Sequence, residues 1–220
     1  MTPLVKLSDP TAIIREGAHL LDIELNLQTI DRMLRHMELI LEWRKHINLT
    51  ALTDREEIAI LHFLDSLTVL KVIPRRDLHL LDVGTGAGFP GLVLRIVEEN
   101  LRLSLLDKDP KKIVFLKHAV HNLGLSGIQF LNIPVQKLFK NPQIFDAIVS
   151  RAFSSDPKLL DQFHLLLPVG GYLIQMSGPA FENISVNLPH FLEQCVWQGI
   201  LPFSQHFRKV ILYTKHVDSV

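Results

Sequence analysis

The sequence predicts an α/β fold in which a parallel sheet has helices on both faces and is preceded by a helical extension. Three observations support it. Residues 9–72 have the apolar periodicity of helices, whereas after residue 74 short apolar runs alternate with amphipathic ones. A glycine-rich turn follows one of the apolar runs, at residues 84–91. We therefore expect a helical extension over residues 1–73 and one compact α/β domain over residues 74–220.

The helical extension has clear start signals. Asp9 before Pro10 is typical of a helix N-terminus, and Asn26 can cap a second helix. A third helix is predicted to start near Asp54. In the second helix apolar residues recur every three or four positions, which gives it one apolar face: Ile30, Leu34, Met37 and Leu41.

Strands and helices alternate through the rest of the chain. Strands are expected at residues 79–83, 101–106, 128–133, 145–149 and 171–176, and strand-like runs at 193–201 and 207–215. Helices are expected at about 90–98, 111–123 and 156–167. Alternation with this period is typical of parallel strands joined by crossover helices.

Composition narrows the class of protein. The chain has 220 residues, 47% of them hydrophobic, which suffices for one α/β domain and an appendage. We expect a cytoplasmic protein without membrane spans, since no apolar run reaches about 18 residues and no signal pattern begins the chain. We also expect it to be a monomer. The single cysteine, Cys195, excludes internal disulfides. Lysine plus arginine equals aspartate plus glutamate at 23 each, so any RNA contact must use a local patch.

No metal site is expected, because the 11 histidines show no ligand spacing such as His-Glu-x-x-His. His62 and Asp65 lie one helical turn apart. We expect this pair to fasten the helical extension to the sheet.

The turn after the first strand predicts a small-molecule site. Gly84, Gly86 and Gly88 permit positive φ angles and a close approach of the backbone to a ligand. Phe89 stands where a dinucleotide fingerprint needs its third glycine, and no Gly-Lys-Ser/Thr of a P-loop follows. Asp82 before the turn disfavours a pyrophosphate but suits a ligand with cations and hydroxyls. S-adenosylmethionine has a sulfonium, an ammonium and a ribose diol; the alternative is an ordinary glycine-rich turn.

Asp107 ends the second predicted strand, about 25 residues after Asp82. An acid at this place accepts hydrogen bonds from ribose hydroxyls in nucleotide-type sites. The alternative is that Asp107 caps the following helix. Four lysines come next, and they form either a phosphate-binding surface or a solvated helix face: Lys108, Lys111, Lys112 and Lys117.

Arg151 follows the fourth predicted strand, where no Asn/Asp-Pro-Pro-aromatic motif for gripping an exocyclic amine occurs. Cys195 lies in an apolar context, which argues against covalent attack on a pyrimidine ring. An acceptor atom that needs neither nucleophile nor base fits such a site, and guanine N7 is one. Arg151 is the candidate catalytic residue, since its fork matches guanine O6 or a phosphate. The alternative is an arginine that binds the carboxyl end of a helix.

Five segments together resemble the bacterial small-subunit ribosomal RNA methyltransferase G family, also called glucose-inhibited division protein B. They are Asn48-Leu49-Thr50, His62-x-x-Asp65-Ser66, Asp82 to Gly91, Leu106-Asp107 with Lys111-Lys112-x-x-Phe115-Leu116, and Ser150-Arg151-Ala152. The resemblance covers roughly residues 25–216. It implies a Rossmann-like class I S-adenosylmethionine-dependent methyltransferase with an N-terminal helical extension. The implied reaction methylates N7 of one guanine in small-subunit (16S) rRNA, with that RNA or the assembling 30S subunit as partner.

The resemblance also implies roles for single residues. Gly84 and Phe89 match cofactor-loop positions, and Val135 with Gln136 would lie beside the adenine. Arg151 matches the arginine of a family motif. This arginine would contact the cofactor and also act as the catalytic residue toward the acceptor. Basic positions that would face RNA or cofactor are matched by Lys111, Lys112 and Arg208, to which Lys108 of the lysine cluster is added.

Three positions depart from the family pattern. Pro134-Val135-Gln136 replaces Arg-x-Glu, Met176-Ser177-Gly178 replaces Leu-Lys-Gly/Ala, and Lys108 replaces a common serine. Gln136 can still accept a hydrogen bond from an exocyclic amine. Lys108 would restore the charge missing at Ser177 if the two strand ends were neighbours. These departures leave two alternatives: a small-molecule methyltransferase of the same fold, and a non-catalytic ribosome-assembly factor that retains cofactor binding.

Overall fold

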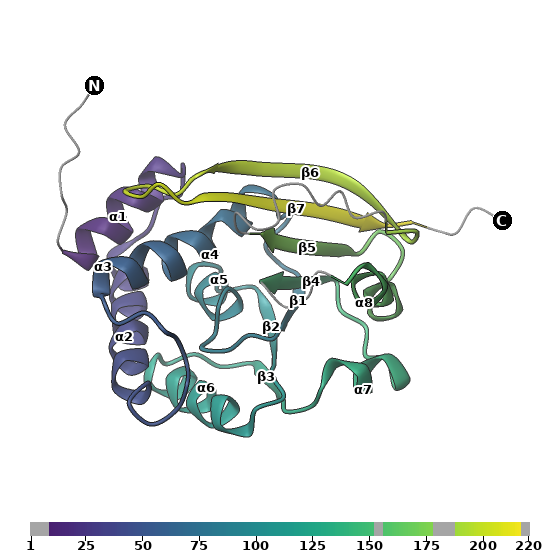
Figure 1. Ribbon diagram of the computed structural model, residues 1–220, viewed down its shortest axis with the longest axis horizontal. Helices are drawn as coiled ribbons and strands as arrows, with labels where there is room; N and C mark the ends of the chain where they lie inside the picture. Colours follow the sequence, from purple (N-terminus) through teal and green to yellow (C-terminus); the bar gives the residue numbers. More distant parts are fainter. Residues whose placement is uncertain (1–8, 152–155, 178–187, 217–220) are drawn as a thin grey trace.

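The computed structural model describes residues 9–151, 156–177 and 188–216. In these ranges a seven-stranded sheet has the order β3-β2-β1-β4-β5-β7-β6 and lies between two helical layers (Figure 1). Its strands are β1 (His79–Val83), β2 (Arg102–Leu106), β3 (Ile128–Leu131), β4 (Ala147–Arg151), β5 (Tyr172–Ser177), β6 (Phe191–Ile200) and β7 (Phe207–Lys215). The predicted α/β class is confirmed.

The sheet is parallel over β1 to β5 and antiparallel at its C-terminal edge. β7 pairs antiparallel with β5 and with β6. The expectation of a parallel sheet therefore fails for the last two strands. For β6 and β7 the reason is the short connection over residues 201–206, since parallel neighbours need a crossover of a dozen residues or more.

The helices before the sheet begin where the capping residues predict. Asp9, Asn26 and Asp54 each accept a hydrogen bond from a backbone N–H of the first turn. The elements are α1 (Pro10–Leu20), α2 (Leu27–Trp43), α3 (Arg55–Ile58), the π-helix η1 (Ala59–Leu64), α4 (Asp65–Leu67) and the 3₁₀ helix η2 (Thr68–Lys71). The predicted third helix is thus a series of short segments with different winding.

Shorter helices connect the strands. They are α5 (Gly91–Val97), α6 (Pro110–Asn122), α7 (Val135–Lys140), α8 (Pro157–Asp161) and the 3₁₀ helix η3 (Gln162–Leu166). Helix α7 is absent from the sequence prediction, because six residues are too few for a helical period to be recognised. No helix in the described part is long and apolar enough to cross a membrane.

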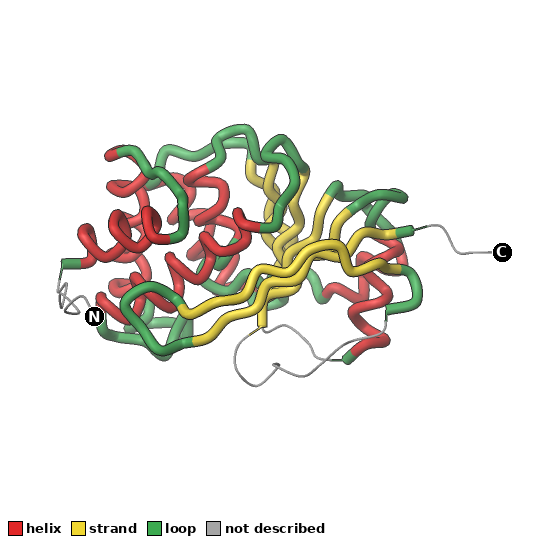
Figure 2. Tube along the Cα trace, turned by 90° about the horizontal axis from the view of Figure 1, so that it is seen from above, coloured by secondary structure: helices red, strands yellow, loops and turns green. Residues whose placement is uncertain are grey.

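Each face of the sheet has its own hydrophobic core. Leu80 of β1 packs in one core with Met37 of α2 and Phe63 of η1, whereas its neighbour Leu81 packs in the other with Phe163 of η3. Alternate residues of a strand point to opposite faces, so a strand covered on both sides is apolar throughout. In Figure 2 the large helical layer and the small one flank the twisted strands. Because the N-terminal helices share a core with the sheet, the domain boundary at residue 73 stays a proposal.

Candidate active site

The glycine loop leaves the carboxyl end of β1 in the conformation that the sequence predicts. Gly84, Gly86 and Gly88 have φ angles of 72°, 58° and 97°. A Cβ added to Gly86 would meet only open space, with Gly84 O at 3.9 Å, whereas one on Gly88 would lie 2.9 Å from Leu92 Cβ. Gly86 therefore borders free space, while Gly88 is required by packing.

Asp82 supports the loop from beneath. Its side chain is completely buried, and Oδ2 accepts a hydrogen bond of 2.8 Å from Gly91 N at the start of α5. Burial raises the pKa of Asp82 to about 6, although the hydrogen bond from Gly91 opposes this shift. A contact of Asp82 with a cofactor stays a prediction, since the carboxylate lies behind the loop.

A first cavity, of about 370 Å³, opens beyond the ends of β1 and β2. Its lining brings together five of the nine predicted cofactor residues: Gly84, Asp107, Val135, Gln136 and Arg151. Leu106, Lys108, Lys112 and Pro134 complete the lining, whereas Asp82, Gly86, Gly88 and Phe89 are not part of it. Helix α7 supplies Val135 and Gln136, so the segment that the sequence left without structure completes this cavity. We call it the cofactor cavity.

Asp107 is held in place by the backbone on either side of the cofactor cavity. Its Oδ2 accepts a hydrogen bond of 3.1 Å from Gly86 N, and its Oδ1 accepts one of 2.9 Å from Asp109 N. The cap of α6 is Asp109, whose side chain accepts from Lys111 N. The alternative that Asp107 caps this helix is therefore wrong, and its carboxylate is left to orient the loop and to face a ligand.

A second cavity, of about 440 Å³, lies on the other side of Arg151. Its lining includes Thr50, Leu61, His62, Asp65, Met176, Ser177 and Arg208, with Arg151 itself. The lining residues come from the helical extension and from β4, β5 and β7. We call it the acceptor cavity. Among the residues that the structure describes, Arg151 alone lines both cavities.

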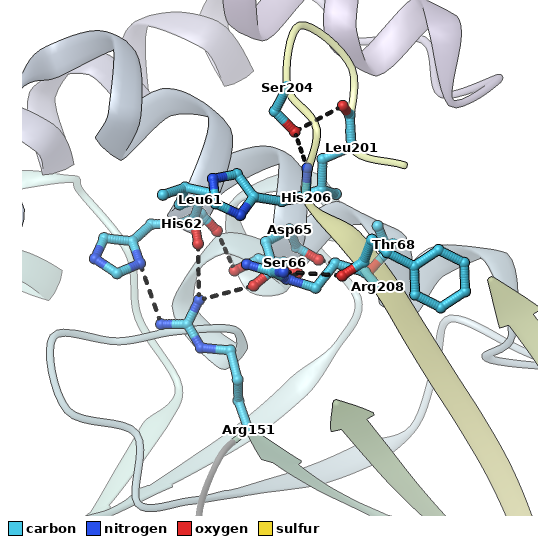
Figure 3. A network of polar contacts seen from close by, with 11 residues as sticks. Leu61, His62, Asp65, Ser66, Thr68, Arg151, Leu201, Ser204, His206 and Arg208 are labelled. Atoms are coloured by element: carbon cyan, nitrogen blue, oxygen red, sulfur yellow. Dashed lines mark hydrogen bonds and ion pairs between the residues drawn. The ribbon is translucent and has the colours of Figure 1, made fainter. Parts of the chain in front are cut away.

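Arg151 is fixed by the helical extension, as Figure 3 shows. Its Nη1 donates to Leu61 O at 3.3 Å and to Asp65 Oδ2 at 3.4 Å, and its Nη2 donates to His62 Nδ1 at 3.4 Å. Burial lowers the pKa of Arg151, while the Asp65 carboxylate opposes the shift. The alternative, an arginine that binds the carboxyl end of a helix, is met only in part: Leu61 O belongs to η1, but η1 continues directly into α4.

Asp65 joins the two arginines of the acceptor cavity. Arg208 Nε donates to Asp65 Oδ1 at 3.2 Å, opposite the contact with Arg151. Burial raises the pKa of Asp65, and the two guanidinium groups act against this. One carboxylate thus orients two cations that face the same space.

Phe89 connects the glycine loop to this cluster. It is 3% exposed, and its ring lies between those of His36 and His62, with centroid distances of 5.3 and 4.6 Å. The Arg151 guanidinium lies over the same ring at 5.2 Å. Phe89 therefore holds the loop against the helices and does not line the cofactor cavity. Burial lowers the pKa of His62 to about 3, so this ring is neutral near pH 7.

His36 contacts the glycine loop, and no sequence motif singles it out as a site residue. Its Nε2 lies 2.8 Å from Ala87 O, to which only an N–H can donate. Burial lowers the pKa of His36 to about 4. The one sequence signal is its place on the apolar face of the second predicted helix, three residues after Met33.

The predicted RNA-binding residues do not form one surface. Lys108 and Lys112 border the cofactor cavity, where Lys112 Nζ lies 3.8 Å from Asp107 Oδ2. Lys111 is exposed on α6, whereas Arg208 lines the acceptor cavity. Lys108 does not replace a charge at Ser177: β2 and β5 are separated by β1 and β4, roughly 14 Å of sheet.

Asp161, His164 and His190 form a cluster of potential metal ligands away from both cavities. The two imidazole rings are stacked, with centroids 3.7 Å apart and planes at 18°. Nearly parallel rings direct their in-plane lone pairs side by side, so one ion does not suit both. His164 Nδ1 lies 2.6 Å from the backbone oxygen of Asp161, and His190 Nδ1 lies 2.6 Å from its carboxylate oxygen Oδ2. The geometry therefore favours hydrogen bonds to Asp161 over a shared metal ion.

Comparisons with known proteins match most of this chain. Residues 29–193 match the GidB family model, described as rRNA small subunit methyltransferase G. The curated ribosomal RNA small subunit methyltransferase G of Acetivibrio thermocellus is 34% identical over 212 residues, which cover 92% of this chain and 87% of that protein.

Solved structures share the fold at low sequence identity. A variant of MtNAS in complex with S-adenosylmethionine has a TM-score of 0.58 at 15% identity, over 94% of this chain and 88% of that one. Coclaurine N-methyltransferase bound to N-methylheliamine and SAH has a TM-score of 0.57 at 10% identity, over 94% of each chain.

Proposed function

The chain belongs to the rRNA small subunit methyltransferase G (GidB) family, and on that premise we propose that it methylates N7 of one guanine in small-subunit (16S) rRNA with S-adenosylmethionine. The observation that carries the proposal is the position of Arg151 between two cavities. A methyltransferase must hold the methyl donor and the acceptor base next to each other. Arg151 lines both cavities, so a donor in one cavity and a base in the other would meet beside it. Acting on ribosomal RNA, the protein would work in the cytoplasm, as a monomer.

The residues of the cofactor cavity fit S-adenosylmethionine. Asp107 offers a carboxylate to the ribose hydroxyls, and Gly86, whose N–H donates to that carboxylate, leaves open space where a side chain would stand. Val135 and Gln136 offer an apolar contact and an amide to the adenine. When bound, S-adenosylmethionine supplies a methyl group on a positively charged sulfur.

The protein needs only to orient the guanine and the methyl donor, because N7 of guanine already carries an available lone pair. Correct placement of two reactants accounts for a large part of the barrier in such reactions. Arg151 is the candidate catalytic residue: its position is fixed by Leu61, His62 and Asp65, so it can direct a hydrogen bond to the base without rearrangement. His62 is neutral, and no proton transfer is required of it.

The charges around the two cavities suit an RNA substrate. Lys108 and Lys112 line the cofactor cavity, and Lys111 is exposed on the same helix as Lys112, from where these lysines can contact phosphates. Arg208 adds a cation inside the acceptor cavity. These four residues are our proposed RNA contacts.

The test is transfer of a tritiated methyl group from S-adenosylmethionine. Small subunits that lack the modification are compared with a pool of metabolites as acceptors. We expect label in small-subunit rRNA. Label in a metabolite instead would favour a small-molecule methyltransferase, and cofactor binding without any transfer would favour an assembly factor; either result contradicts the proposal.

A further inference from the structure

The hydroxyl group of Thr50 makes two hydrogen bonds within the protein and has the capacity for a third. It lies in the segment between α2 and α3 and lines the acceptor cavity. Its Oγ1 is 2.8 Å from His62 Nε2 and accepts a hydrogen bond of 3.2 Å from Leu52 N. The direction of the contact with His62 decides what the hydroxyl can offer to a ligand.

Arg151 settles the tautomer of His62. An arginine side chain has donors only, so at the 3.4 Å contact Arg151 Nη2 donates and His62 Nδ1 accepts. The ring is neutral, because burial and the Arg151 charge lower its pKa to about 3. A neutral imidazole with a bare Nδ1 carries its proton on Nε2. His62 therefore donates to Thr50, and not the reverse.

Both lone pairs of the Thr50 oxygen are thus occupied, by His62 and by Leu52. The hydroxyl proton has no acceptor among the residues that the structure describes. A hydroxyl in this state can donate one hydrogen bond but cannot accept another. Since the residue borders the acceptor cavity, the open direction is available to a ligand there.

We propose that Thr50 is a specificity-determining residue, whose hydroxyl donates a hydrogen bond to the carbonyl oxygen O6 of the target guanine. The proposal rests on the function proposed above. N7 and O6 lie next to each other on the same edge of guanine, so a base that presents N7 to the cofactor also presents O6.

The same geometry rejects adenine. Adenine carries an amino donor where guanine has O6, beside the same N7. That donor would face Thr50, which cannot accept, and Arg151, which has donors only. A site built to hydrogen-bond one group discriminates strongly against an analogue that leaves its polar atoms unpaired.

The experiment compares two target bases in otherwise identical small-subunit rRNA: guanine, and 2-aminopurine, which lacks O6. On guanine we expect Thr50→Val to lower kcat/KM about tenfold, as the loss of one hydrogen bond implies. On 2-aminopurine the same substitution should lower it less than twofold, because the partner atom is already missing. Thr50→Ser, which keeps the hydroxyl, should recover most of the loss.

Two further arms make the result decisive. Thr53→Val makes the same change at an exposed threonine outside the cavity lining and should match the wild type. Thr50→Ala repeats the comparison should the valine variant fold poorly. An equal loss on both bases, or no loss on guanine, would overturn the role of Thr50 while leaving the methyltransferase function intact. Absence of transfer by the wild type would overturn the proposed function and this inference with it.

Discussion

Asp65 Oδ2 lies 3.4 Å from Arg151 Nη1, although 86 residues separate the two in the chain. The contact joins the helical extension to the end of β4. Because the other oxygen of Asp65 holds Arg208, a single carboxylate from the extension sets both cations of the acceptor cavity. The helical extension thus contributes to the geometry of the acceptor cavity as well as to the hydrophobic core.

The substitution Asp65→Asn tests this role. It keeps the shape of the side chain but leaves two largely buried guanidinium groups without their counter-charge, which we expect to lower the free energy of unfolding by about 3 kcal/mol. Denaturant unfolding measures the loss. Transfer to RNA should fall more than affinity for S-adenosylmethionine, since both arginines lie at the acceptor cavity.

Asp22→Asn is the matched control for this change. Asp22 is 88% exposed and pairs with Lys71, so its removal should cost less than about 1 kcal/mol. Equal effects of the two substitutions would contradict the account of Asp65.

Asp82 gives the stability a characteristic pH dependence. The pKa of Asp82 is about 6 in the folded protein, whereas an unperturbed aspartate, as in the unfolded chain, has a pKa of 3.8. Between these two pH values only the folded state keeps the proton. The stability that Asp82 contributes is therefore full at pH 3.8 and below, and falls by about 3 kcal/mol as pH rises to 6. Asp82→Asn removes this titration.

The measurement is denaturant unfolding of both proteins across pH 4 to 7. The difference in stability between variant and wild type should grow in favour of the variant as pH rises. A difference that does not change with pH would refute the buried, proton-binding state of Asp82.

Calorimetry on the same variant shows whether Asp82 contacts the cofactor. Only a direct contact predicts that Asp82→Asn lowers the affinity for S-adenosylmethionine strongly.

Gly86→Val should abolish binding of S-adenosylmethionine. The branched side chain would enter the open space of the loop, at a φ of 58° that side chains rarely adopt. Gly124→Val is the matched control, since Gly124 has a φ of 64° and open surroundings away from the cofactor cavity. Both variants bear the backbone strain, but only the first should lose the ligand in calorimetry. Equal binding by the two would exclude this loop as the cofactor site.

Lys111→Ala should weaken RNA binding and reduce its salt dependence. One fewer phosphate contact lowers the slope of log K against log salt by about 1. Lys158→Ala removes an exposed lysine of α8, on the other face of the sheet, and should leave the slope unchanged. Titration of RNA at several salt concentrations gives both slopes, and identical slopes for the two variants would remove Lys111 from the RNA surface.

Local signals in the sequence predicted much of this fold. Asp9, Asn26 and Asp54 cap helices in their own first turns, and the glycines of the loop have the positive φ angles expected of them. Such features depend on neighbours in the chain. Part of the cofactor cavity was also predictable, because Gly84 and Asp107 each follow one of two consecutive strands in the alternating pattern, and such strands often lie side by side.

The acceptor cavity was not predictable in this way. Its contacts join residues that are far apart in the chain, as in the 143 residues between Asp65 and Arg208. Sequence patterns assigned His62 and Asp65 a structural role, and only the fold shows that both touch Arg151. The family resemblance places Phe89 at a cofactor-loop position, whereas in the fold its ring stacks against His36 and His62 of the helical extension.

The central claim is that this chain methylates N7 of one guanine in small-subunit rRNA. Mass spectrometry of that rRNA from cells with and without the gene tests it most directly. We predict one 7-methylguanine that is present with the gene, absent without it, and absent when the gene encodes Gly86→Val. Small-subunit rRNA of identical mass with and without the gene would contradict the claim.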